Sequence, residues 1–220
     1  MKVRCFITTY DRPEMLTKAV GNLGRFGIIP TIKDDGSTYE HNLPQYFRHE
    51  HRGKKGFWMT WNEMLDDCKN KETSRPNAEL FIFTVDDFQD LDIKRILELH
   101  EKYKDSPYVY NILNDGREGT WTGIQANQVD DETIMCGMVD CGFFCNARAI
   151  QRLGYYMNPP TQQWWKQGES ISSGVGCMLS QRFMRSKVLM YKPIKSLATH
   201  GTHESKMHPI ERLKNPLKSL

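Results

Sequence analysis

The stretch Glu79–Asp90, ELFIFTVDDFQD, decides the fold. Its centre, Leu80–Val85, is a short, continuous apolar run rich in β-branched and aromatic residues, which is typical of a strand buried on both faces of a parallel sheet. The run ends in Asp86 and Asp87. Open α/β sheets bind ligands in the crevice outside the carboxyl ends of their strands, so these carboxylates lie where a hard divalent cation and its phosphates are expected. The alternative is a solvated turn before a helix that begins with an acidic N-cap.

Val3–Thr9 (VRCFITT) predicts a first buried strand. After it, Pro13 suits the first turn of a helix, and apolar residues follow at helical spacing. Thr9 or Asp11 is expected to cap this helix. The segment is therefore a strand-loop-helix unit.

Ile28–Lys33 predicts a second strand, which runs directly into the sequence Asp34-Asp35-Gly36-Ser37-Thr38. Here again a strand ends in paired acids, and the hydroxyl residues after the glycine can bond a backbone or a ligand. Apolar spacing then predicts helices at 57–68 and 93–103 on either side of the central strand. Alternating strands and helices at this spacing indicate an α/β fold, with a mostly parallel sheet flanked by helices.

The second half of the chain is less regular. Its strand-like runs lie within 108–113, 133–144 and 188–191, and its expected helices lie within 146–154 and 177–184. A chain of 220 residues with 39% apolar residues has enough material for one domain with a full core. We therefore expect a single domain, residues 1–220, with an irregular C-terminal region.

No stretch approaches the roughly 20 consecutive apolar residues that a membrane span requires. The N-terminal sequence also lacks the pattern of a signal peptide, so we expect no transmembrane segment and a cytoplasmic location. Charge is uneven: residues 181–220 carry nine Lys and Arg against two Glu, which leaves +7 in a chain with a total of +3. This basic tail predicts contact with nucleotide phosphates, a polyanionic acceptor or an acidic membrane, unless it is a solvated face.

Five segments, in this order, resemble the GT-A-type glycosyltransferases of the family 2 group: ITTYDRPEMLTKAV, IKDDGST, ELFIFTVDDFQ, CGFFCNARAIQRLGY and KPIKSLATHG. The resemblance implies a hexosyl- or pentosyltransferase that uses a nucleotide sugar. It implies a single GT-A domain with a Rossmann-like nucleotide-binding half, 1–105, and an acceptor-binding half, 106–220, that includes the basic tail. A divalent metal would bridge the diphosphate of the donor.

The resemblance also assigns the nucleotide-binding residues. Asp34 and Asp35 match the DDGS acids, one of which accepts a hydrogen bond from the base. A carboxylate can accept the imide proton of uracil or thymine, and of these we expect a UDP-linked donor. Lys54 lies in a basic loop expected near the same sheet edge. The other matched residues form the loop after the first strand, which contacts the nucleoside: Thr8, Thr9, Tyr10 and Asp11.

Asp86 and Asp87 stand in place of the DXD motif of the family, and here the sequence departs from it. Val85 occupies the first acidic position if Asp87 is the metal ligand, and Phe88 occupies the last acidic position if Asp86 is the first acid. We assign Asp87 as the ligand and Asp86 to the ribose or a metal-bound water. His200 matches a position where some members of the family place a metal-ligating histidine. A carboxylate with an imidazole suits Mn²⁺ or Mg²⁺, and Mn²⁺ is the better match for nitrogen.

The catalytic base is less clearly marked. Inverting members need a carboxylate that takes the proton of the acceptor, and the candidates are Asp140 and Glu169. The alternative is a mechanism other than the usual inverting one. Trp164 and Trp165 are candidates for stacking on an acceptor sugar or base. The sequence leaves the acceptor open among a glycan, a lipid-linked sugar, a protein and a hydroxylated base in modified DNA.

The sequence leaves two other functions open. A non-catalytic nucleotide or nucleic-acid binding module would explain the basic tail, although paired acids at strand ends repel phosphates unless a cation is present. A nucleotidyltransferase also uses strand-end acids and metal, but it usually begins with a glycine-rich phosphate loop. Metal-dependent binding or hydrolysis of a nucleotide sugar would separate these functions.

Overall fold

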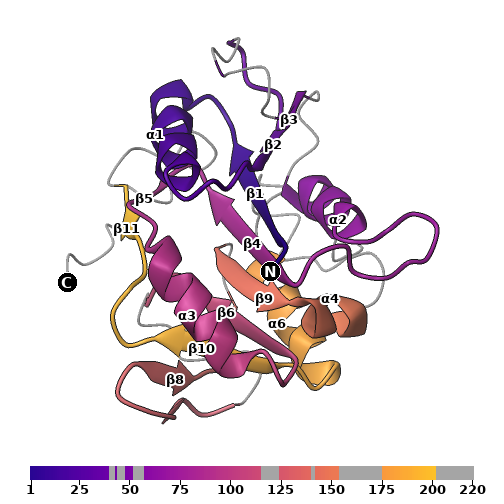
Figure 1. Cartoon of the computed structure of the whole chain (residues 1–220), viewed down its shortest axis with the longest axis vertical. Coiled ribbons are helices and arrows are strands. Elements are labelled where there is room, and N and C mark those ends of the chain that lie inside the picture. The colour runs from indigo at the N-terminus through magenta and orange to yellow at the C-terminus, as the bar shows by residue number, and fades with distance from the viewer. Residues whose placement is uncertain are drawn as a thin grey trace, which may run out of the picture.

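The computed structural model describes residues 1–39, 43, 48–51, 57–114, 124–139, 142–153 and 175–201. The helices in Figure 1 are α1 (Pro13–Gly24), α2 (Phe57–Asp67), α3 (Ile93–Tyr103), α4 (Ala147–Leu153) and α6 (Val175–Arg185). The strands are β1 (Val3–Thr9), β2 (Thr31–Asp34), β3 (Arg48–His51), β4 (Leu80–Val85), β5 (Phe88–Gln89), β6 (Tyr108–Asn111), β7 (Asn127–Gln128), β8 (Thr133–Met135), β9 (Phe143–Asn146), β10 (Leu189–Pro193) and β11 (Thr199–His200).

Nine of these strands form one sheet, in the order β3-β2-β1-β4-β9-β6-β10-β8-β7. The first four are parallel to one another, and β10 is parallel to β6. Strand β9 is antiparallel to both of its neighbours, as is β8. Strands β5 and β11 form a separate two-stranded sheet. The α/β fold with a mostly parallel sheet is therefore confirmed.

Helices cover both faces of this sheet, because its central strands are apolar on both sides. On β4, Leu80 and Ile82 pack in one core cluster with residues of α1 and α3. Phe81 and Phe83 pack in the other cluster with residues of α2, α4 and α6. All four side chains are fully buried. The structure thus confirms that Leu80–Val85 is a strand buried on both faces.

The second strand begins later than predicted. The amide of Ile28 donates to the carbonyl of Leu23, and Gly27 has a φ of 69°, so this segment still belongs to the turn that ends α1. Pro30 cannot donate a backbone hydrogen bond to a neighbouring strand. Strand β2 therefore begins at Thr31.

The predicted cap of α1 is wrong. Its N-cap residue is Arg12, which makes no capping hydrogen bond through its side chain. The Thr9 hydroxyl instead donates to Asp86, and the Asp11 carboxylate accepts from Thr38. Helix α3 does have the expected acidic cap, because Oδ1 of Asp92 accepts from the amide of Arg95 at 3.0 Å.

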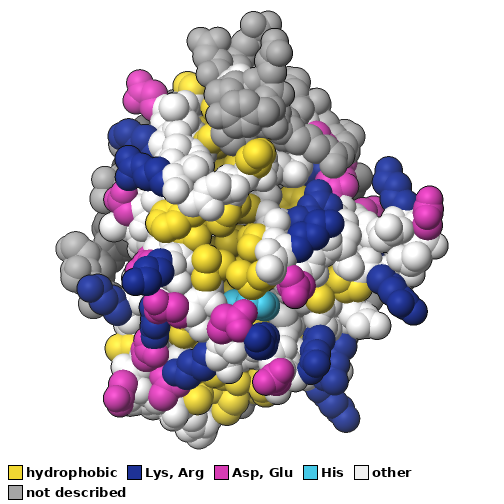
Figure 2. All heavy atoms as spheres, viewed as in Figure 1, with side chains coloured by type: hydrophobic (Ala, Val, Ile, Leu, Met, Phe, Trp, Pro, Cys, Tyr) yellow, Lys and Arg dark blue, Asp and Glu magenta, His cyan; other side chains and the backbone are white. Residues whose placement is uncertain are grey.

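The surface in Figure 2 carries Lys and Arg side chains interspersed with Asp and Glu. In the part of the chain that the structure describes, no helix has the length and apolar character needed to cross a membrane. Residues 202–220 of the basic tail lie outside the described residues.

Candidate functional site

The ends of β1, β2 and β4 meet at one edge of the sheet. Thr9 pairs with Asp34 on one side, and Thr8 pairs with Val85 on the other. Backbone hydrogen bonds continue past these pairs. The amide of Asp35 donates to the carbonyl of Thr9, and the amide of Asp86 donates to the carbonyl of Thr8, both at 3.1 Å. This register brings the two acidic pairs to either side of the end of β1.

The four carboxylates at this edge are buried. Asp34 and Asp35 are 3% and 8% exposed, and Asp86 and Asp87 are 3% and 4% exposed. A solvated turn is therefore excluded for Asp86 and Asp87. Buried charges of one sign are unfavourable unless a cation or hydrogen-bond donors compensate them.

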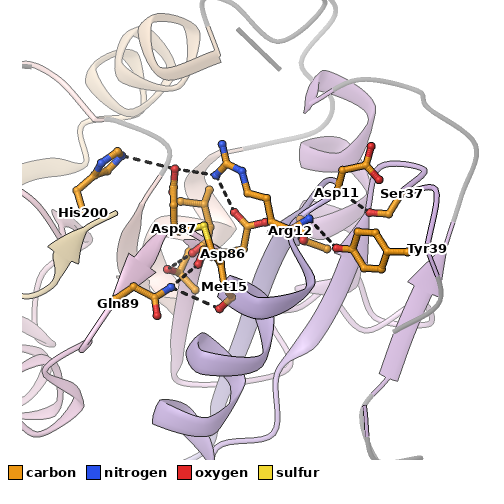
Figure 3. A network of polar contacts seen from close by, with 12 residues as sticks. Asp11, Arg12, Met15, Ser37, Tyr39, Asp86, Asp87, Gln89 and His200 are labelled. Carbon is orange, nitrogen blue, oxygen red and sulfur yellow. Dashed lines mark hydrogen bonds and ion pairs between the residues drawn. The ribbon is translucent and has the colours of Figure 1, made fainter. Parts of the chain in front are cut away.

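Arg12 supplies a cation to one of these pairs (Figure 3). Its Nη1 lies 3.1 Å from Oδ1 of Asp86 and 2.9 Å from Oδ2 of Asp87. Thr9 donates its hydroxyl to Oδ2 of Asp86 at 2.7 Å. Sequence reasoning missed Arg12, although an arginine immediately after a strand-end loop, in a chain with acids at neighbouring strand ends, was a usable signal.

Burial and neighbouring charges shift the pKa values of Asp86 and Arg12. Burial raises the pKa of Asp86 to about 6, and the charge of Asp87 adds to this, while Arg12 and Thr9 oppose it. Burial lowers the pKa of Arg12, but the two carboxylates raise it by more. Arg12 therefore stays positively charged between them.

His200 reaches the same place from the far end of the chain. Strand β11 pairs antiparallel with β5, which sets His200 opposite Phe88, and the amide of Gly201 donates to the carbonyl of Asp87 at 2.8 Å. As a result, Nε2 of His200 lies 3.7 Å from Oδ2 of Asp87 (Figure 3). The structure thus brings together the two residues expected to bind metal.

Phe88 holds this pairing in position. Its ring meets the His200 ring edge-on, with centroids 5.7 Å apart. Gly142 lies so close to Phe88 that a Cβ atom there would fall 2.0 Å from the Phe88 ring. The residue at 142 must therefore be glycine for Phe88 to keep this position.

The side chains at this site provide only some of the ligands that a divalent cation needs. Asp87 and His200 offer a carboxylate oxygen and an imidazole nitrogen, a combination that fits Mn²⁺. Across the described ranges, no group of three or more His, Cys, Asp or Glu side chains is arranged to hold a metal. A metal bound here would need its remaining ligands from phosphate oxygens and water, as is common for cations in nucleotide sites.

The loops after β1 and β2 are tied together by side-chain hydrogen bonds. Asp11 has a φ of 52°, and its amide donates to the Ser37 hydroxyl at 2.9 Å. Its carboxylate accepts from the amide of Thr38 at 2.7 Å. The carboxylate of Asp34 accepts from both the amide and the hydroxyl of Ser37. Asp34 therefore stabilises the loop, a role that the sequence did not predict.

The other predicted nucleotide residues lie at or near this loop. Thr8 is buried near the end of β1, and Tyr10 is half-buried just beyond it. Several predicted residues lie outside the described residues: Lys54, Asp140, Glu169, Trp164 and Trp165.

This chain has the GT-A fold of glycosyltransferases, as comparison with solved structures shows. Its neighbours include GalNAc-T7, in a structure with UDP, GalNAc and Mn²⁺, with a TM-score of 0.58 and 11% identity over 87% of this chain. TarS 1–349 from S. aureus has a TM-score of 0.56 and 12% identity over 93% of this chain. A197 from STIV has a TM-score of 0.52 and 13% identity over 91% of this chain.

The match spans 42% of the GalNAc-T7 chain, 61% of the TarS chain and 85% of A197. No protein-family model matches the sequence, and no curated protein matches it either. At these identities the likeness establishes the fold alone.

Proposed function

We propose that this protein is a metal-dependent glycosyltransferase that moves a sugar from a UDP-linked donor to a hydroxyl acceptor. The observation that carries the proposal is the approach of His200 to Asp87, 3.7 Å apart, at the end of the central strand of a GT-A fold. An imidazole nitrogen and a carboxylate oxygen from two distant segments meet at the carboxyl ends of the strands, where open α/β sheets bind ligands.

The donor would lie across the ends of β1, β2 and β4. Its diphosphate would share a divalent ion with Asp87 and His200, and Asp86 would face the ribose or a metal-bound water. The uracil would lie against the loops after β1 and β2, with the carboxylate of Asp35 or Asp34 as acceptor for its imide proton. The hydrogen bonds of Ser37 to both loops support a preformed nucleoside site.

The reaction is a substitution at the anomeric carbon of the donor sugar. The acceptor oxygen forms a bond to that carbon, the bond from carbon to the diphosphate oxygen breaks, and the electron pair leaves with the diphosphate. The hydroxyl proton passes to a carboxylate base, for which Asp140 and Glu169 are the candidates. A bound divalent ion would neutralise charge on the leaving diphosphate.

The remaining assignments of the acceptor half belong to the same proposal. Trp164 and Trp165 would stack on the acceptor, and Lys54 would contact the nucleotide phosphates. The transferred sugar would be a hexose or a pentose, and the acceptor would be a hydroxyl on a glycan, a lipid-linked sugar, a protein or modified DNA. GalNAc-T7, which shares the fold, has a structure with UDP, GalNAc and Mn²⁺, and this supports the choice of donor and metal.

A thermal-shift screen of nucleotide sugars tests the proposal, because a ligand that binds only the folded state raises the melting temperature. We expect at least one UDP-sugar to raise it in Mn²⁺ and to have a much smaller effect in chelator. The matched control is Asp87→Asn, which should lose the Mn²⁺-dependent part of the shift. A protein that no nucleotide sugar stabilises, with or without Mn²⁺, would contradict the assignment.

A further inference from the structure

Arg12 bridges two buried carboxylates, and one of them, Asp87, is also the expected metal ligand. Its Nη1 contacts Oδ2 of Asp87 at 2.9 Å, and the same oxygen lies 3.7 Å from Nε2 of His200. The second contact, to Oδ1 of Asp86 at 3.1 Å, makes the guanidinium a bridge across the pair. The arginine side chain is 12% exposed, so this contact is largely shielded from water.

A metal ion and this guanidinium would compete for one oxygen atom. Mn²⁺ binds a carboxylate oxygen at roughly 2.2 Å, a distance typical of such ligands. With Nη1 of Arg12 at 2.9 Å from Oδ2 of Asp87, the two cations would lie within about 5 Å of each other. At a buried site their repulsion is screened far less than in water.

We infer that Arg12 is an internal counter-cation, which neutralises the Asp86–Asp87 pair in the free protein and must leave it before a divalent metal ion can bind to Asp87 and His200. This inference rests on the proposed function, because it concerns the same metal site. Arg12 is a positioning residue here, and its effect is to weaken the binding of metal in the absence of donor.

The backbone around Arg12 is held in place, so the exchange requires movement of its side chain alone. The amide of Arg12 donates to the Tyr39 hydroxyl at 2.7 Å, and the preceding Asp11 is fixed by Ser37 and Thr38. An arginine side chain is long enough to turn from a carboxylate pair to a nearby diphosphate, which is an equally good bidentate partner. The donor diphosphate would therefore favour metal binding in two ways. Its oxygens provide ligands for the metal, and it gives the Arg12 guanidinium another anion to contact.

The consequence is a strong coupling between donor and metal. Mn²⁺ alone should bind the wild-type protein weakly, and UDP should raise the affinity for Mn²⁺. Because such coupling is reciprocal, Mn²⁺ should raise the affinity for UDP by the same factor. Without Arg12, the buried carboxylates lose the positive charge of this guanidinium, and Mn²⁺ should bind more readily even when no nucleotide is present.

Binding of Mn²⁺ to nucleotide-free protein, followed by electron paramagnetic resonance of the free ion, tests this inference without any activity assay. We expect Arg12→Gln to bind Mn²⁺ at least about tenfold more tightly than wild type, which corresponds to about 1.4 kcal/mol. Arg95→Gln is the matched control, since Arg95 pairs with two other carboxylates, Glu98 and Glu132. That variant should bind Mn²⁺ as wild type does.

The outcomes separate the inference from the proposed function. Equal affinities for Mn²⁺ in wild type and a folded Arg12→Gln would overturn the role of Arg12 and leave the metal site standing. If no variant binds Mn²⁺, even with UDP present, both fail. If Arg12→Gln does not fold, Arg12→Lys replaces it, because a lysine lacks the planar fork that bridges both carboxylates. Arg12→Lys should bind Mn²⁺ at least about threefold more tightly than wild type, and an unchanged affinity would overturn the inference.

Discussion

Nε2 of His200 lies 3.7 Å from Oδ2 of Asp87, although the two residues come from opposite halves of the chain. The contact follows from two short strands, because β5 continues from Asp87 and β11 ends at His200. Their antiparallel pairing brings both side chains to the carboxyl end of β4. A metal site built from these two residues would be lost if either half unfolded, so we expect metal binding to be coupled to folding of the whole domain.

Thr9→Val should destabilise the fold. The change keeps the shape of the side chain but removes the hydroxyl that donates to the buried Asp86 carboxylate at 2.7 Å. Loss of one buried hydrogen bond to a charged group costs about 1.5 to 3 kcal/mol. Urea unfolding in chelator measures this loss in the free energy of unfolding. Thr17→Val is the control, because the Thr17 hydroxyl is exposed and donates to the carbonyl of Pro13 rather than to a buried charge. An equal loss in the free energy of unfolding for Thr9→Val and Thr17→Val would contradict a stabilising role for the Thr9–Asp86 hydrogen bond.

Gly142→Ala should disturb the site from a distance. A Cβ atom at this position would lie 2.0 Å from the Phe88 ring, so the ring must shift, and with it the pairing of β5 with β11. Overpacking of this kind costs about 1 to 3 kcal/mol. Gly21→Ala is the control, because nothing lies within 4 Å of a Cβ atom there and alanine favours the helix. A Gly142→Ala protein with wild-type melting temperature and Mn²⁺ affinity would refute this role for Phe88.

The sequence predicted the elements that are carried by strong apolar patterns. Strands β1 and β4 and helix α3 have the predicted bounds, because each has a continuous apolar run or a regular apolar stripe. Strand β3, with the sequence RHEH, was missed because it has no apolar pattern. Its place in the sheet depends on pairing with β2, which local sequence does not reveal.

Contacts between residues distant in sequence also limited the prediction of the candidate site. Asp86 and Asp87 were identified as candidates from their position after a strand, where open sheets bind ligands. His200 was identified from its match to a position where some family 2 glycosyltransferases place a metal-ligating histidine. Arg12 was missed because its role depends on a contact with carboxylates far away in sequence. The loop role of Asp34 was missed for a different reason. An aspartate that accepts from the residue three positions ahead looks the same in sequence as one that accepts from a ligand.

Asp35→Ala should weaken nucleotide binding with little loss of structure elsewhere. If its carboxylate accepts the imide proton of uracil, removal should cost about 1 to 3 kcal/mol in the binding of UDP. Calorimetric titration with UDP in Mn²⁺ measures this, and Asp105→Ala, beyond the end of α3, is the control. Unchanged affinity for UDP in both Asp35→Ala and Asp34→Ala would remove these acids from the donor site.

His100 should lower the stability as the pH falls below about 6.5, and the raised pKa of Asp86, about 6, acts in the opposite direction. His100 is 3% exposed, and burial lowers its pKa from the usual value of 6.5. The unfolded chain therefore takes up a proton at a pH where the folded protein does not, and stability is lost from the ordinary pKa down to the lowered one. The slope contributed by one such group is at most about 1.4 kcal/mol per pH unit.

His100→Gln should reduce this acid sensitivity, because glutamine does not titrate. Urea unfolding of both proteins at a series of pH values from 7 to 5 gives the comparison. Parallel loss of stability in wild type and His100→Gln would assign the acid sensitivity to other groups.

Release of UDP from UDP-sugars tests the central claim most directly. We expect wild-type protein to release UDP from at least one UDP-sugar in Mn²⁺, and to lose this activity in chelator. Asp87→Asn should abolish it, and His200→Ala should reduce it strongly, with both variants still folded by circular dichroism. Undiminished release in chelator, or a normal rate in Asp87→Asn, would contradict the metal site, and no release from any nucleotide sugar would contradict the proposed function itself.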